Sequence, residues 1–208
     1  MIRVHHLNNS RSQRILWLLE ELGVPYEVVR YERDAATMLA PPALKAVHRL
    51  GKSPVIEDGG RVIAESGAIV EYLAETHGGG RLVPKDPEAR LRYRYWMHFA
   101  EGSMMTPLLL KLYAGRMGEA AAPLAERADA QMQLLLGHVD AELGDMPFMA
   151  GAELSAADAQ MSFPMEAAAA RGGLGPHFPR AWAWLERIRA RPAYARALER
   201  GGPFEILR

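Results

Sequence analysis

Two short stretches of this chain carry residues whose types and spacing suit the binding of a carboxylate. Glu65 and Ser66 follow a predicted strand and open a predicted helix, and Pro54 enters another predicted strand from a loop. Backbone donors at a helix N-terminus attract a carboxylate, and a proline between a loop and a strand can fix an unusual backbone edge. Together these features predict a pocket for a small peptide with a free α-carboxylate.

The first 76 residues alternate between strand and helix patterns. Short apolar runs predict strands, the helical spacing of apolar residues after Ser12 predicts a helix, and Asp58-Gly59-Gly60 is a strong hairpin signal. Two parallel strands joined by a helix form a right-handed βαβ unit. The order is therefore βαβ and then ββα, a thioredoxin-like α/β arrangement. We expect strands at 2–7, 26–31, 55–56 and 61–63, and helices at 12–22, 42–47 and 65–76.

A stretch rich in Gly and Pro separates this part from a helical remainder. Residues 77–87 include three consecutive glycines and two prolines, a composition typical of an interdomain linker. Beyond it, the apolar residues predict a long helix at 87–117, interrupted near Gly102 and Pro107, and another at 123–143. We therefore predict a thioredoxin-like domain at 1–78, a linker at 79–86 and an all-α helical-bundle domain at 87–208.

The helical remainder contains a capping motif. Ser155 and Asp158 have the spacing of a capping box, in which each side chain bonds the backbone of the other residue, and Leu154 stands at the hydrophobic-staple position. A capping contact stabilises a fold by about 1 kcal/mol. We therefore assign Asp158 to stability rather than to catalysis.

Composition limits the function. The 208 residues include 25 Lys and Arg, 25 Asp and Glu, and no cysteine. The balanced charge gives no basis for binding nucleic acid or an anionic membrane. Without cysteine there is no disulfide, thiolate metal site or cysteine nucleophile. With no long apolar span and no leader pattern at the N-terminus, we expect a soluble, cytoplasmic protein.

The histidines do not predict a metal site. His5 and His6 are adjacent on a predicted strand, so their side chains point to opposite faces and cannot chelate one metal together. The other five histidines are scattered without the spacing of metal ligands.

Seven short motifs, in this order, resemble those of one protein family. With the thioredoxin-like first part, the linker, the helical second part and the capping box, the chain resembles a soluble glutathione transferase over nearly its whole length. More narrowly, it resembles the subclass typified by a fungal microsome-associated glutathione transferase and its bacterial relatives. The motifs are His6–Arg11, Tyr31–Asp34, Ala40–Lys45, Leu50–Pro54, Ala64–Gly67, Glu101–Ser103 and Met161–Pro164.

The resemblance implies which residues bind glutathione. In the family the Glu-Ser turn, here Glu65 and Ser66, holds the γ-glutamyl end. Ser66 would offer its hydroxyl and backbone N–H to the carboxylate, and Glu65 would accept from the α-ammonium group. Ser53, which precedes the expected cis-proline Pro54, would pair its backbone with the cysteinyl unit like an added strand. Lys52 lies where the family often places a side chain for the glycyl carboxylate.

The family's reaction needs glutathione as a thiolate. A free thiol has a pKa of about 8.5, and lowering it by roughly two units takes about 2.7 kcal/mol. A hydrogen-bond donor near the start of the first helix can supply much of this. The loop 8–12 holds neither Tyr nor Cys, so the chain is not a tyrosine-type or cysteine-type member. Ser10 matches the Ser-Arg of the most similar subclass, Asn9 stands where serine-type classes place their serine, and Ser12 is third and most simply caps the helix.

Three functions remain open on the sequence. The first is conjugation of glutathione to an apolar electrophile, and the second is a glutathione-dependent peroxidase that uses the same thiolate. The third is a non-catalytic, transferase-like binding or regulatory module. Glutathione would be a co-substrate, and no cofactor is implied. The resemblance also implies a homodimer, in which Glu101 is the possible acidic residue that reaches the partner's glutathione.

Overall fold

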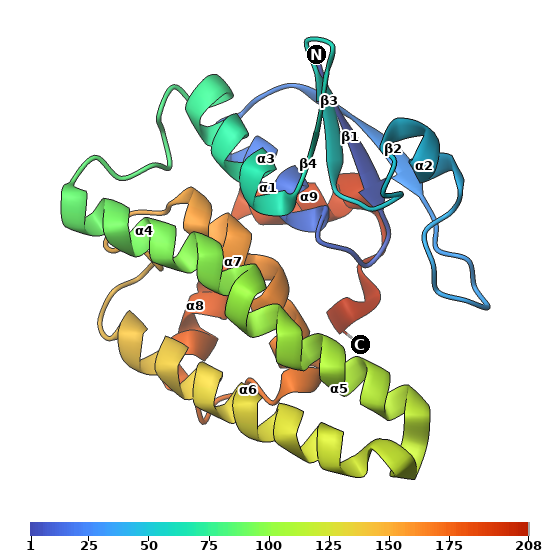
Figure 1. Cartoon of the computed structure of the whole chain (residues 1–208). Coiled ribbons are helices and arrows are strands. Elements are labelled where there is room, and N and C mark those ends of the chain that lie inside the picture. Colours follow the sequence, from blue (N-terminus) through green and yellow to red (C-terminus); the bar gives the residue numbers. More distant parts are fainter. Residues whose placement is uncertain (208) are drawn as a thin grey trace. The chain divides into compact units, whose positions relative to one another are not determined.

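The computed structural model describes residues 1–207, and of Leu207 only the backbone. Within these residues the chain forms two compact units (Figure 1). Unit 1 comprises Met1–Val83 and Arg189–Glu205, and unit 2 comprises Pro84–Ile188 with the chain end from Ile206. The first boundary, between Val83 and Pro84, falls inside the stretch that the sequence suggests as a linker.

Unit 1 is built on a four-stranded mixed sheet with the strand order β2-β1-β3-β4. β1 and β2 are parallel, with Ile2 opposite Tyr26, and β3 runs antiparallel to both β1 and β4. The helix α1 connects the parallel pair, as a βαβ unit requires. The thioredoxin-like arrangement expected from the sequence is confirmed. The strands are β1 (Ile2–Leu7), β2 (Tyr26–Tyr31), β3 (Val55–Asp58) and β4 (Arg61–Ala64).

The helices of unit 1 bury apolar faces, and α1 is the most deeply buried of them. Eight of the ten α1 residues are buried, and the helix ends where Gly23 adopts a left-handed conformation at φ 65°. The expected hairpin turn is also present, with Gly59 and Gly60 both at positive φ. The helices are α1 (Gln13–Leu22), α2 (Ala43–Val47), α3 (Ser66–Tyr72), which a π-helical turn (Leu73–His77) extends, and α9 (Pro192–Gly201).

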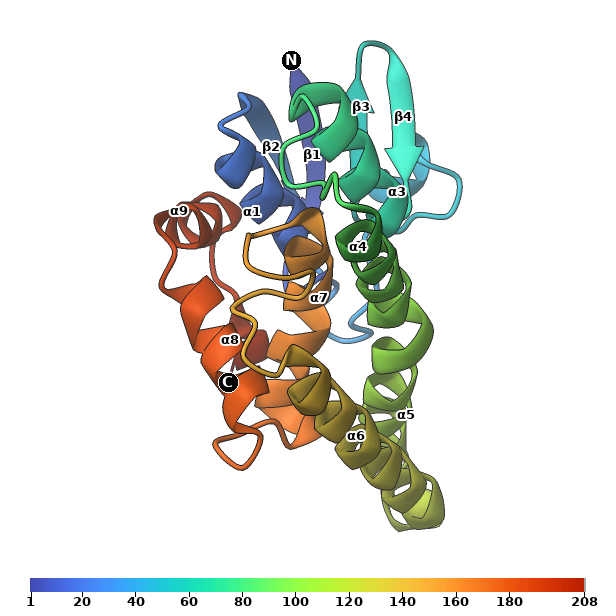
Figure 2. The same cartoon turned by 90° about the vertical axis from the view of Figure 1, so that its left-hand side faces the viewer.

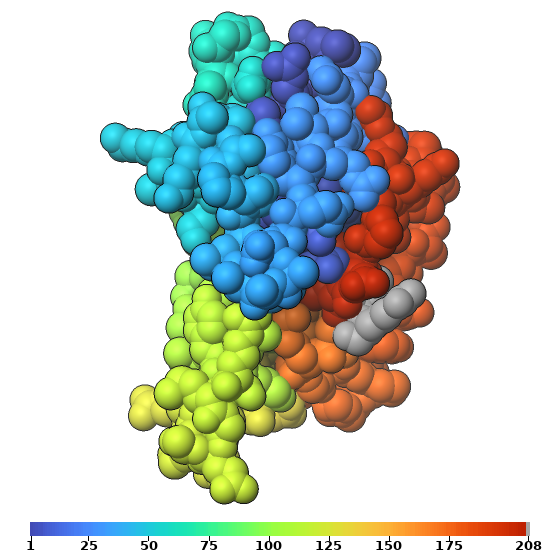
Figure 3. All heavy atoms as spheres, turned by 90° about the vertical axis from the view of Figure 1, so that its right-hand side faces the viewer, coloured from blue at the N-terminus to red at the C-terminus, as the bar shows by residue number. Residues whose placement is uncertain are grey.

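α9 belongs to unit 1, although the sequence places it with the helical domain at 87–208. It packs against α1, and a Cβ atom on Gly201 would come within 2.7 Å of Gln13 Oε1. A side chain at position 201 would therefore displace the end of the Gln13 side chain. Ion pairs support the contact, such as Arg196–Glu20 at 2.7 Å. Figure 3 shows the C-terminal segment (red) alongside the β2 region (blue), where Arg200 donates to the Tyr26 carbonyl oxygen at 2.6 Å.

Unit 2 is helical, as expected. α5 and α6 lie side by side and antiparallel (Figure 2). A π-helical turn at Ala100–Met104 separates α4 from α5; it accounts for the expected interruption near Gly102 and lies one turn before Pro107, which lacks an N–H for the helix ladder. In the part of the chain that the structure describes, no helix is long and apolar enough to span a membrane. The helices are α4 (Pro87–Phe99), α5 (Met105–Met117), α6 (Ala122–Leu143), α7 (Ala156–Ala167) and α8 (Pro179–Arg189).

The capping box at the start of α7 does more than cap the helix. Asp158 is fully buried and accepts hydrogen bonds from the backbone N–H and hydroxyl of Ser155 at 2.8 and 2.9 Å. Its other oxygen accepts from the Met149 N–H and from Trp184 Nε1, both at 2.8 Å. Burial raises the pKa of this carboxyl, and the four donors oppose that rise. Asp158 thus joins α7, α8 and the loop before α7, in agreement with a role in stability.

We expect Asp158→Ala to lower the free energy of unfolding by at least about 3 kcal/mol, because it leaves four buried donors without their acceptor. Urea unfolding followed by circular dichroism measures this. Asp145→Ala, which changes an exposed residue of the same loop, is the matched control and should cost less than about 0.5 kcal/mol. A loss below 1 kcal/mol for Asp158→Ala would contradict the structural role.

Candidate functional site

Three loops with predicted site residues meet at one edge of the sheet in unit 1. Residues 8–12 follow β1, residues 52–54 precede β3, and residues 65–66 follow β4. Because β3 is antiparallel to both neighbours, with Val55 opposite His5 and Ala64, these three strand ends lie at the same edge. The remaining candidate, Glu101, lies in unit 2, half-buried in the π-helical turn after α4.

The backbone N–H of Leu7 holds two of these loops. It donates to Ser53 Oγ at 3.2 Å and to Ser12 Oγ at 3.3 Å, and Ser53 Oγ donates to the His5 carbonyl oxygen at 2.8 Å. The Ser53–Pro54 peptide bond is cis, as expected. Among the described residues, the backbone N–H and C=O of Ser53 have no backbone partner, so they can pair with an extended ligand. Lys52 is exposed.

Ser10 is held in a buried hydrogen-bond chain. Only 5% of its surface is exposed, and its Oγ lies 2.8 Å from Ser12 Oγ and accepts from the Ser12 N–H at 3.3 Å. Ser12 Oγ lies 2.8 Å from His6 Nδ1. Ser12 stands at the N-cap position of α1, but its hydroxyl makes no capping bond. The expectation that Ser12 simply caps the helix is therefore wrong, because its hydroxyl is taken up by His6 and Leu7.

Asn9 occupies an unusual backbone conformation beside the C-terminal segment. Its φ is 50°, in the left-handed region that asparagine tolerates better than most residues. Its side-chain Oδ1 accepts from the backbone N–H of Glu205 at 2.7 Å. The carbonyl oxygen of the same residue faces the Arg33 guanidinium at 3.5 Å. Asn9 is half-buried, and thus more accessible than Ser10.

The Glu65–Ser66 turn is a strained junction between β4 and α3. Glu65 is exposed and has φ 71° and ψ 119°, which non-glycine residues rarely adopt. Its carbonyl oxygen accepts from the Ile69 N–H at 2.9 Å, which fixes the first turn of the helix. Ser66, 6% exposed, is the first residue of α3. Backbone strain of this kind clusters at functional sites, so it makes this turn a candidate for one.

His6 is the main electrostatic feature near this edge. Burial lowers its pKa to about 4, the positive charge of Arg30 adds to this effect, and a hydrogen bond to the Gly201 backbone opposes it. The imidazole is therefore neutral at physiological pH. His5 lies on the opposite face of β1, with its ring nitrogens 2.9 Å from Tyr31 Oη and 2.8 Å from Glu57 Oε1.

The sequence analysis did not identify two groups that contact the loop after β1, the His6 side chain and the backbone N–H of Glu205. His6 shares its strand face with Ile2 and Val4, which are buried, so strand alternation contains a signal that this histidine faces the helix. The backbone N–H of Glu205 has no such signal, because only the packing of α9 brings this residue to Asn9.

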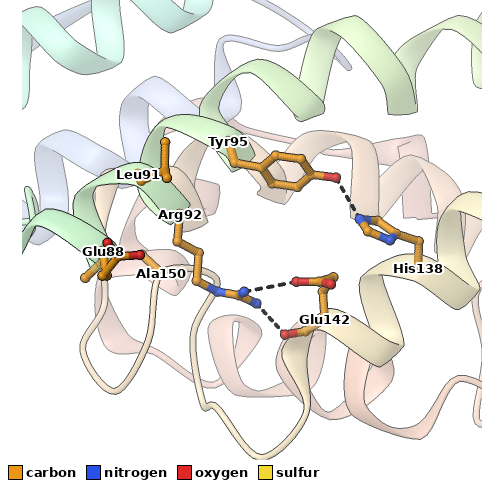
Figure 4. Close-up of a pocket in the computed structure, with 8 residues that line it drawn as sticks. Glu88, Leu91, Arg92, Tyr95, His138, Glu142 and Ala150 are labelled. Carbon is orange, nitrogen blue, oxygen red and sulfur yellow. Dashed lines mark hydrogen bonds and ion pairs between the residues drawn. The ribbon is translucent and has the colours of Figure 1, made fainter.

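Unit 2 carries a pocket of about 650 Å³ between α4, α6 and the loop near Ala150. Figure 4 shows Tyr95 facing His138, at 2.7 Å between Oη and Nε2, and Arg92 reaching Glu142. None of the predicted site residues lines this pocket. Four of its polar side chains form two pairs, Tyr95 with His138 and Arg92 with Glu142.

The fold defines a thioredoxin-like domain followed by an all-helical domain. Two family models match the chain: "Glutathione S-transferase, N-terminal domain" over residues 1–75 and "Glutathione S-transferase, C-terminal domain" over residues 96–192. The chain therefore belongs to the glutathione S-transferase family and is a glutathione transferase. The resemblance drawn from the seven motifs is confirmed at the level of the family, and the narrower subclass stays a prediction.

Individual proteins agree with this assignment. Glutathione S-transferase 3 of Schizosaccharomyces pombe is 34% identical, over 96% of this chain and 88% of its own length. A crystal structure of a glutathione S-transferase from Actinobacillus pleuropneumoniae is 35% identical, with a TM-score of 0.87 over 100% of this chain and 96% of its own. A family member from Pseudomonas fluorescens, whose structure contains two bound glutathione molecules, is 27% identical, with a TM-score of 0.82 over 95% and 92%.

We expect the buried, neutral His6 to make folding stability depend on pH. Its pKa of about 4 in the fold lies below the value of about 6.5 in the unfolded chain, so the unfolded state binds more protons between these values. Stability should fall by roughly 3 kcal/mol as pH drops from 7 to 4 and should change little from this cause below pH 4. Urea unfolding at several pH values measures the loss.

His6→Asn should remove this part of the pH dependence, because asparagine does not titrate and still offers an amide to Ser12. The matched control is His98→Asn, which changes an exposed histidine of α4 and should follow the wild-type curve. An equal loss of stability on acidification in His6→Asn and the wild type would show that His6 is not the cause.

Proposed function

We propose that this transferase binds glutathione at the sheet edge of unit 1 and presents its thiolate to an apolar electrophile. The observation that carries the proposal is the joint presence of two features at this edge. One is the strained Glu65–Ser66 turn, and the other is Ser53, whose backbone is free to pair, before a cis-proline. The bound glutathione of the Pseudomonas fluorescens relative supports the same ligand here.

We assign the ends of the tripeptide to separate groups. The hydroxyl and backbone N–H of Ser66 bind the γ-glutamyl carboxylate, and the exposed Glu65 accepts from the α-ammonium group. The cysteinyl unit pairs with the backbone of Ser53 beside Pro54, which sets its sulfur near the loop after β1. Lys52 is exposed and supplies a positive charge for the glycyl carboxylate.

The chemistry requires a donor for the thiolate, and Ser10 and Asn9 are the two candidates in the loop after β1. When the thiol ionises, its proton leaves to water. The thiolate then attacks an electrophilic carbon, a C–S bond forms, and the leaving group departs with its electron pair. A preorganised donor favours the thiolate over the thiol and so raises the reactive fraction at neutral pH.

Family membership also supports a homodimer and a cytoplasmic location. In such a dimer Glu101 of one subunit would reach the glutathione of the other. Light scattering on the purified protein tests the dimer, and a monomer at micromolar concentration would remove this role from Glu101.

We expect the protein to bind reduced glutathione with micromolar to millimolar affinity, and Ser66→Ala to weaken binding tenfold or more, which is about 1.4 kcal/mol. The reason is the loss of a hydroxyl donor to a carboxylate. Isothermal titration calorimetry measures both. Thr76→Ala, which removes an exposed hydroxyl of the same unit, is the matched control and should bind like the wild type.

The same preparations decide between the alternatives. Turnover of an aryl halide with glutathione establishes conjugation. Turnover of an organic hydroperoxide with glutathione, but of no aryl halide, favours the peroxidase. Binding without either activity points to a non-catalytic module. No heat of binding at millimolar glutathione would refute the proposed ligand.

A further inference from the structure

The hydroxyl of Ser10 is hydrogen-bonded to another buried side chain, and the direction of that bond can be worked out from His6. His6 carries one ring hydrogen because its pKa is about 4, and a backbone carbonyl such as that of Gly201 can only accept. The ring hydrogen therefore faces Gly201, and Nδ1 is left as an acceptor for Ser12 Oγ at 2.8 Å. Ser12 has a single hydroxyl proton, which this bond can use. Ser12 Oγ also lies 3.3 Å from the Leu7 carbonyl oxygen, a second acceptor for the same proton. With its proton directed to His6 or Leu7, Ser12 accepts at the 2.8 Å contact with Ser10 Oγ, and that contact uses the proton of Ser10.

The side-chain amide of Asn9 is oriented in the opposite sense. The backbone N–H of Glu205 can only donate, so the atom of Asn9 that it meets at 2.7 Å is the oxygen. Among the described residues nothing accepts from the Asn9 Nδ2 group, and the residue is half-buried rather than buried. Asn9 therefore offers two N–H donors at the loop where the family activates the thiol.

We propose that Asn9 is the side-chain donor to the glutathione thiolate and that the backbone N–H of Glu205, in the C-terminal segment, is the positioning group that orients it. This proposal rests on the proposed function, since it concerns the same bound glutathione. In it, Ser10 belongs with Ser12 and His6 to a buried chain that holds the loop.

The orientation matters because an amide has a donor end and an acceptor end. With Oδ1 turned toward the sulfur, a lone pair would face the negative charge and would raise the thiol pKa. With Oδ1 held by Glu205, the N–H groups face the sulfur site and lower it. The orienting bond comes from the backbone, so the side chain at position 205 is not needed for it.

The experiment removes the orienting N–H of residue 205 without changing the loop after β1. Glu205→Pro removes the backbone N–H at the first residue of a short 3₁₀ segment (Glu205–Leu207), where proline is tolerated. Glu205→Ala keeps the N–H and is the matched control. The readouts are the pKa of the bound glutathione thiol, from the ultraviolet absorbance of the thiolate, and kcat/KM for an aryl halide.

We expect Glu205→Pro to raise the thiol pKa and lower kcat/KM about tenfold at neutral pH, mostly in kcat, while glutathione affinity changes less than threefold. Glu205→Ala should show less than half of that shift. Asn9→Ala and Asn9→Asp should raise the thiol pKa more than Ser10→Ala does. The Asp variant still accepts from Glu205 but has no hydrogen to donate, so it tests the proposal even if Glu205→Pro fails to fold.

Two results would overturn the inference. One is a thiol pKa in Ser10→Ala that rises as much as in Asn9→Ala, and the other is a Glu205→Pro variant that behaves like Glu205→Ala. A wild-type protein that binds no glutathione would instead refute the proposed function, and calorimetry reveals this before any variant is compared.

Discussion

The backbone N–H of Leu7, at the last residue of β1, faces two hydroxyl oxygens from loops that are far apart in the sequence. A buried N–H without a partner costs free energy comparable to a lost hydrogen bond. Ser12 and Ser53 both satisfy it, and they thereby hold the loop after β1 against the loop before β3. The placement of every site candidate in unit 1 except Glu65 and Ser66 depends on this junction, and the pairing of β3 with β4 brings those two to the same edge.

A second constraint is the close packing of α9 against α1. Gly201 has no side chain, and a Cβ atom there would lie 2.7 Å from Gln13 Oε1 and 3.0 Å from Leu16 Cδ1, so a larger residue would displace these side chains. This approach presents the Gly201 backbone to His6 and leads the chain toward Asn9. Residues Arg189–Glu205 are therefore part of the thioredoxin-like unit, although they follow the main part of the helical unit in sequence. A buried histidine and the segment after α9 together shape the loop after β1, which holds both proposed thiolate donors.

Much of the fold follows from local patterns. The alternation of strand and helix signals before residue 77, the Asp58-Gly59-Gly60 turn and the helical spacing beyond Pro87 correspond to elements that the structure contains. The capping box of Ser155 and Asp158 was readable because it depends on residues three positions apart. The further hydrogen bonds of Asp158 to Met149 and Trp184 cannot be predicted from the sequence, since they join segments that only packing brings together.

The sequence by itself determined the family, the Glu65–Ser66 turn, the proline before β3 and the short set of donors in residues 9–12. These features depend on residue types at fixed short spacings along the chain, so they can be recognised without the three-dimensional structure. Only the tertiary structure decided which way each donor points. The direction of the Ser10 hydroxyl depends on His6 through Ser12, and the orientation of the Asn9 amide depends on Glu205. Hydrogen bonds have a direction that is set by their partners in space, and a linear sequence does not reveal those partners.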